Sequence, residues 1–182
     1  VSVTVRTADG PDAAEAVALG RADLAIVAGG DVAPDLTVER ITRVPPMVVM
    51  RADHALVAKA RIRLADLDGV PMVLPPPGRP HRARIADAMR ARGFALAVAL
   101  EVGGWDAMAD FAGMGLGVAI INGCVTVPRR LVTRPLVGLE AVEYQLVRRG
   151  AGGSADVLAD AILARKTEWR RRRDTAWARA RS

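Results

Sequence analysis

One short arrangement of residues occurs twice in the chain, and it limits the folds that the chain can form. In each copy, a helical stretch ends at a glycine and leads into an apolar strand. The first copy runs from residues 12–19 to Leu24–Ala28, and the second runs from residues 106–112 to residues 118–121. Repeated helix-to-strand units predict an α/β protein with two small lobes. A cleft between two lobes is a common place for a small-molecule site.

The rest of the pattern also alternates between short strands and helices, which predicts mainly parallel sheets. We expect a first lobe from residues 1–70 plus 127–164 and a second lobe from residues 71–126. The two chain crossings between the lobes would form a hinge. The expected strands are 1–6, 24–28, 36–44, 46–50, 72–74, 95–102, 118–121, 131–135 and 142–147, and the expected later helices are 80–92, 105–112 and one that begins at Ser154.

Composition is compatible with a packed aliphatic core. Hydrophobic residues make up 51% of the 182 residues, whereas aromatic residues make up only 3%. No apolar run approaches the roughly 20 residues that a membrane-spanning helix needs. The first residues show no secretory signal pattern. Cys124 is the only cysteine, so an internal disulfide is excluded and a reducing compartment such as the cytoplasm is favoured.

The net charge of +6 comes from the end of the chain. Residues 165–182 contain eight arginines and lysines but only two acidic residues, and the preceding 164 residues are neutral in sum. A basic tail can contact nucleic-acid phosphates, but a solvated tail is the simpler interpretation because no groove-reading motif accompanies it.

Four segments in order resemble a known protein family. They are the entry to the first apolar strand (GRADLAIV), the HALV segment at His54, the LADL turn at Leu64 and the GMGLG segment before the second repeated strand. Together they are similar to the effector-binding domain of LysR-type transcriptional regulators over about residues 1–164. One departure is Ala55, which stands where the family commonly has proline.

The resemblance implies a type II periplasmic-binding-protein fold, with a small-molecule effector bound between two α/β lobes. It also implies a homodimer, or a tetramer in the full regulator, that contacts DNA through a winged helix-turn-helix domain not found in this chain. Residue 1 aligns with the family's second strand, so we expect the first lobe to lack its first strand and helix.

The loop after the expected strand 72–74 is the strongest candidate site. Ligands of open α/β sheets bind beyond the carboxyl ends of strands, and the backbone N–H groups at a helix start attract anions. An arginine here could bind a carboxylate bidentately, although a rigid turn with solvated arginines is the alternative. The candidate ligand-binding residues are Pro76, Pro77, Gly78, Arg79 and Arg82.

Two further segments are candidates. Gly104 would let the backbone approach a ligand closely, and Trp105 could form an apolar wall or simply belong to the core. In the first lobe, the residues after the first expected strand could face the cleft or could cap a helix; they are Thr7, Asp9 and Gly10.

Other chemistries receive little support. His54 and His81 are far apart and form no recognisable metal set with Cys124, and no nucleophile elbow or phosphate-binding loop occurs. We therefore expect no metal, no cofactor, no membrane association and no catalytic activity. The main alternative function is a solute-binding protein of a transport system with the same fold, and an enzyme on that fold ranks below it.

Overall fold

The computed structural model describes residues 2–8, 10–30, 32–150, 154–166 and 168. These residues divide into two compact units, and the chain passes from one unit to the other at Val44/Pro45 and at Ala141/Val142. The chain is mixed α/β, as the alternating pattern predicts. Among the described residues, no helix combines the length and the apolar character that a membrane crossing requires.

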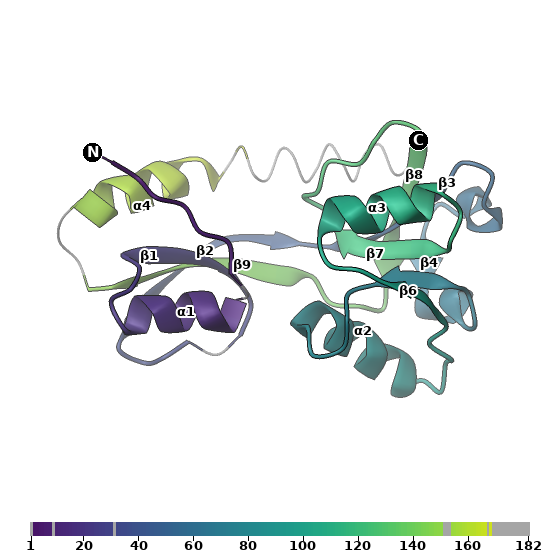
Figure 1. Cartoon of the computed structure of the whole chain (residues 1–182), viewed down its shortest axis with the longest axis horizontal. Helices are drawn as coiled ribbons and strands as arrows, with labels where there is room; N and C mark the ends of the chain where they lie inside the picture. The colour runs from purple at the N-terminus through teal and green to yellow at the C-terminus, as the bar shows by residue number, and fades with distance from the viewer. Residues whose placement is uncertain (1, 9, 31, 151–153, 167, 169–182) are drawn as a thin grey trace. The chain divides into compact units, whose positions relative to one another are not determined.

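Unit 1 is a three-stranded antiparallel sheet with one helix on each face. Its strands lie in the order β1 (Leu24–Ala28), β9 (Val142–Arg149), β2 (Leu36–Val44). Helix α1 (Gly10–Ala18) covers one face and α4 (Ser154–Ala164) covers the other (Figure 1).

Alternation along β9 explains how one short sheet holds two helices. Successive side chains of a strand point to opposite faces. Val147 accordingly packs with Val17 of α1, whereas Leu146 packs with Ala159 of α4. Arg148 adds polar contacts, because its guanidinium pairs with Glu39 on β2 and with Asp156 on α4.

Unit 2 is built on a six-stranded mixed sheet in the order β4-β8-β3-β7-β5-β6. Strand β3 runs antiparallel to both of its neighbours, and the other three ladders are parallel. Two short 3-10 helices, η1 (Ala55–Ala58) and η2 (Leu64–Leu67), flank β4. The strands are β3 (Pro46–Arg51), β4 (Ile62–Arg63), β5 (Met72–Leu74), β6 (Val98–Glu101), β7 (Val118–Asn122) and β8 (Leu131–Val137).

Two helices cover the opposite faces of this sheet (Figure 1). Helix α2 (Pro80–Arg90) packs through Ile85 and Met89 against Leu74 and Ile120. Helix α3 (Trp105–Gly113) packs against the alternate strand residues, including Val73 and Ile121. The continuous apolar strands β5 and β7 are therefore buried on both faces, as expected for interior parallel strands.

In the second repeated unit, Gly117 allows two segments of backbone to pack closely. Its φ is +148°, and a Cβ at this position would overlap the backbone carbonyl of Pro71. The Val118 N–H donates to that same carbonyl at 2.9 Å. Only glycine allows the chain to enter β7 this close to the start of β5.

Three sequence-based expectations differ from the structure. The described residues 2–8 form no strand, because no strand of the described chain pairs with them. The continuous apolar run of β1 is typical of a buried parallel strand, but β1 pairs antiparallel with β9. The expected lobe boundaries near residues 70 and 127 fall inside unit 2, because β3, β4 and β8 join the same sheet as β5–β7.

Candidate functional site

The carboxyl ends of β5 and β6 bring two of the predicted loops together. These strands are parallel neighbours, with Leu74 opposite Glu101. Just beyond them, the Val102 N–H donates to the Leu74 carbonyl at 3.0 Å. The loop before α2 and the loop before α3 therefore leave the sheet side by side. This edge is where open α/β sheets place their ligands.

Both loops lead directly into helices whose first turns lack a side-chain cap. Arg79 is the N-cap residue of α2 and Gly104 is the N-cap residue of α3, and neither makes a capping side-chain hydrogen bond. Gly104 has a φ of +87°, a backbone conformation that glycine adopts without strain. Uncapped first-turn N–H groups and the helix dipole create a positive potential that favours an anion.

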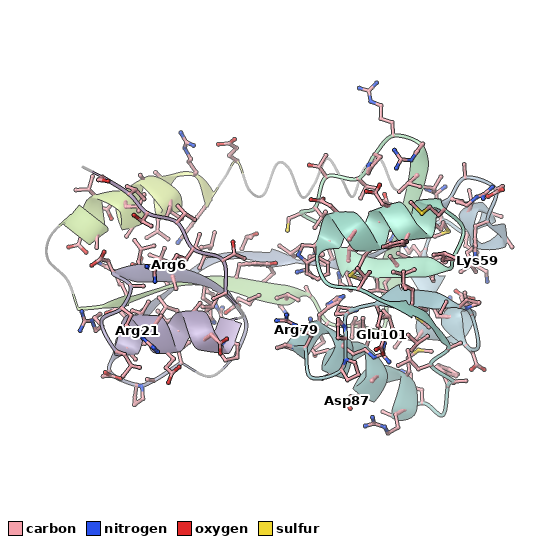
Figure 2. The ribbon with its side chains drawn as sticks, in the orientation of Figure 1. Arg6, Arg21, Lys59, Arg79, Asp87 and Glu101 are labelled. Atoms are coloured by element: carbon pink, nitrogen blue, oxygen red, sulfur yellow. The ribbon has the colours of Figure 1, made fainter. Side chains whose placement is uncertain are left out.

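The loop before α2 changes from buried to exposed along its length. Pro75 is buried, Pro76 is half-buried, and Pro77, Gly78 and Arg79 are exposed. Arg79 lies at the start of α2 and Glu101 at the end of β6 (Figure 2). The proline-rich loop is thus a short rigid connection that presents its last residues to solvent.

Arg82, in the first turn of α2, carries an incompletely satisfied buried charge. Its side chain is only 14% exposed, and its nearest ionic partner, Glu101, lies 3.7 Å away with 44% of its side chain exposed. The Nη1 atom is buried and has no hydrogen-bond partner among the described residues. Buried charged donors usually have partners, so this guanidinium retains capacity for an acceptor.

His81 is the site residue to which sequence reasoning assigned no role. Its Nε2 lies 2.7 Å from the Ile120 carbonyl oxygen on β7, and its ring meets that of Trp105 edge-on. Burial is the main cause of a lowered His81 pKa, opposed by the bond to Ile120 and reinforced by the nearby Arg84 charge. In the sequence, only its position directly after Pro80, which starts the helix, indicates that His81 lies at this site.

Trp105 is half-buried at the first position of α3 and packs beside the cluster of apolar residues under that helix. A half-buried Trp105 is compatible both with an apolar wall of the site and with a core residue. Contact between Trp105 and a ligand therefore stays a prediction.

The first-lobe candidates belong to unit 1. Thr7 is exposed in the segment before α1, and Gly10 is the half-buried first residue of α1. Asp9 lies outside the described residues. They belong to a different unit from the loops at the ends of β5 and β6, and their role in ligand binding stays a prediction.

The remaining reactive side chains form no second centre within the described chain. Asp110 pairs with Arg130 at 2.8 Å on an exposed surface, which fits a solvated helix face. Cys124 is exposed. In the described ranges, no cluster of three or more His, Cys, Asp or Glu residues could hold a metal ion.

Two α/β units, one of them with paired loops at the carboxyl edge of parallel strands, define a ligand-binding domain of the type II periplasmic-binding-protein fold. Residues 1–162 match the family model for the LysR substrate binding domain. The chain belongs to this family, and it is the effector-sensing domain of a LysR-type transcriptional regulator.

Solved structures agree with this assignment. The C-terminal domain of a probable LysR family transcriptional regulator from Rhodococcus sp. RHA1 is 27% identical, with 91% of this chain and 84% of that chain covered and a TM-score of 0.73. The CcmR regulatory domain from Synechocystis PCC6803, in complex with 2-PG, is 17% identical, with 90% and 82% covered and a TM-score of 0.77.

The BenM effector binding domain, with its effector benzoate, is 16% identical, with 90% of this chain and 77% of that chain covered and a TM-score of 0.71. The two structures below 25% identity support the fold alone. A comparison with curated protein sequences found no match.

Proposed function

We propose that this effector-sensing domain binds a small organic carboxylate at the carboxyl edge of β5 and β6. The buried Nη1 of Arg82, which lacks an acceptor among the described residues, is the observation that carries the proposal. A carboxylate there would supply the missing acceptor and would also lie near two uncapped helix starts. Arg79, Gly78 and Gly104 would complete the ligand surface.

Similar structures support an acidic ligand by analogy. BenM is described with benzoate and CcmR with 2-PG. Both are distant relatives, so they suggest a class of ligand and not the effector of this chain.

The bound effector would act as a regulatory signal and not as a substrate. A ligand that binds one conformation more tightly shifts the population toward it. We propose that this shift changes the arrangement of a cytoplasmic homodimer or larger oligomer, and through it DNA binding by a separate winged helix-turn-helix domain. We assign the domain no catalytic activity, cofactor or metal.

Calorimetric titration with benzoate and with 2-PG tests the carboxylate site. Arg82→Gln removes the charge while keeping amide hydrogen bonding, and we expect it to weaken binding roughly tenfold to a hundredfold. Arg82→Lys keeps the charge but loses the planar fork, so its affinity should fall between those of Arg82→Gln and the wild type.

Arg90→Gln is the matched control, because Arg90 lies on the same helix but pairs with Asp87 on an exposed surface. It should bind as the wild type does. Thermal unfolding of all variants separates lost affinity from lost folding. Equal binding by folded Arg82→Gln and the wild type would remove Arg82 from the site.

A further inference from the structure

His81 connects three elements at the edge where the proposed effector site lies. It is the second residue of α2, and its Nε2 lies 2.7 Å from the Ile120 carbonyl oxygen of β7. Its ring centroid lies 4.8 Å from that of Trp105, at the start of α3. The ring planes meet at 83°, the edge-to-face geometry that aromatic pairs favour. One side chain therefore fixes the start of α2 relative to both β7 and α3.

The hydrogen bond also determines where the proton of His81 resides. A carbonyl oxygen only accepts, so Nε2 carries the hydrogen and donates it. The Nδ1 atom is buried and has no hydrogen-bond partner in the described part of the chain. A second proton on Nδ1 would create a buried N–H group without an acceptor, close to Arg84. Burial therefore favours the neutral ring with its hydrogen on Nε2.

Side-chain capping does not restrain these two helix starts. The N-cap residues of α2 and α3 make no capping side-chain bonds. Gly103 and Gly104 precede α3, and open space surrounds the position that a Cβ would occupy at each of them. Neither glycine therefore contributes a side-chain contact that would hold the segment leading into α3. At the first residue of α3, Trp105 restrains the helix start through its contact with His81 and its packing on the cluster under α3.

We propose that His81 is a positioning residue for effector binding, which orients Arg82 and the first turns of α2 and α3 without contacting the ligand. This inference rests on the proposed carboxylate site. Arg82 directly follows His81, so the direction of its guanidinium depends on how the first turn of α2 is held. Loss of the His81 contacts would leave the charge in place but in variable orientations, and a bidentate carboxylate bond tolerates little misorientation.

Two substitutions separate the hydrogen bond from the ring. His81→Gln keeps an amide donor at about the distance of Nε2, whereas His81→Leu keeps volume and loses the donor. Both are made in a Trp169→Phe, Trp177→Phe background, so that Trp105 is the only tryptophan. Titrations use benzoate and 2-PG, and acrylamide quenching reports the accessibility of Trp105.

We expect His81→Leu to weaken carboxylate binding on the order of tenfold and to increase Trp105 quenching. His81→Gln should recover most of the affinity because it restores the bond to Ile120. Ile85→Val is the stability control, since Ile85 is fully buried on the same helix but lies outside the first turn. It should lower stability and leave affinity within about twofold.

Three results would overturn the positioning role. They are wild-type affinity in folded His81→Leu, no rescue by His81→Gln, and an equal loss of affinity in Ile85→Val. Failure of the carboxylate site itself gives a different pattern, in which the wild type binds neither acid or Arg82→Gln binds as well as the wild type. Trp105 quenching in the ligand-free protein then still decides whether His81 holds the two helix starts together.

Discussion

The imidazole of His81 and the indole of Trp105 meet edge-on, with ring centroids 4.8 Å apart. His81 belongs to the helix on one face of the six-stranded sheet, and Trp105 begins the helix on the other face. Their contact therefore joins the helices on the two faces of the sheet, at the carboxyl ends of the parallel strands. Such pairs contribute about 1 kcal/mol beyond the burial of their area, which makes this contact a measurable part of the stability of unit 2.

The stability of unit 2 should decrease as the pH falls below about 6.5, the ordinary pKa of histidine. Burial lowers the His81 pKa in the folded state, so the unfolded chain takes up a proton first as the pH falls. The stability that neutral, buried His81 contributes is fully present above the His81 pKa of the unfolded chain. It is lost as the pH falls toward the lower His81 pKa of the folded state. Urea midpoints measured by Trp105 fluorescence at about pH 7.5 and about pH 5.5, in the Trp169→Phe, Trp177→Phe background, report this loss.

His81→Gln serves as the control for this pH dependence because it cannot titrate. Its urea midpoint should fall less between the two pH values than that of the wild type, and the difference isolates His81 from the carboxylates. An identical fall in both proteins would show that His81 does not cause the effect.

Removal of the Trp105 ring should make His81 easier to protonate. Trp105→Ala exposes the imidazole to water, and burial is the largest cause of its lowered pKa. The His81 pKa should therefore rise toward 6.5, as measured by NMR titration of the ring proton signals. The loss of packing should also lower the free energy of unfolding by about 2 kcal/mol.

Trp105→Phe is the matched variant, since it retains an aromatic ring against His81. It should leave the His81 pKa closer to the wild-type value than Trp105→Ala does. If both substitutions leave the pKa unchanged, Trp105 does not shield His81 from water.

Substitution of Gly117 tests the close approach between β7 and β5. In Gly117→Ala, the added Cβ would overlap the Pro71 carbonyl, and the backbone φ of +148° would be strained. We expect the free energy of unfolding of unit 2 to fall by about 3 kcal/mol in urea denaturation. Gly103→Ala adds the same methyl group in open space, and it should change stability by about 0.5 kcal/mol or less.

The sequence predicts the local elements of this fold better than their partners. The helix–glycine–strand units at Leu24–Ala28 and Val118–Asn122 both form, because apolar runs and glycine stops are local signals. Strand direction is not local. Strand β1 has an apolar run like that of β7, yet it lies at the edge of an antiparallel sheet, whereas β7 lies inside a mixed one.

The candidate site shows the same limit. The Pro75–Arg79 loop and the Gly104–Trp105 segment were identified from strand ends and glycines, which are visible in the sequence. That the two are neighbours depends on the parallel pairing of β5 with β6. The role of His81 depends on a carbonyl 39 residues further along the chain, and no local pattern indicates such a contact.

The charge network of Arg148 should hold α4 on the sheet of unit 1. Arg148 is 18% exposed, and its guanidinium pairs with Glu39 at 3.1 Å and with Asp156 of α4. Arg148→Met keeps much of the side-chain volume but removes one cation from beside two half-buried carboxylates, which should cost about 2 kcal/mol. We expect faster amide hydrogen exchange in peptides from α4, measured by mass spectrometry, while α2 and α3 in unit 2 exchange as in the wild type.

Arg40→Met is the matched control, because Arg40 pairs with Glu143 on the same sheet but is 79% exposed. Its exchange pattern should match that of the wild type, and an equal effect of both substitutions would indicate that surface charge, not the Arg148 network, holds α4.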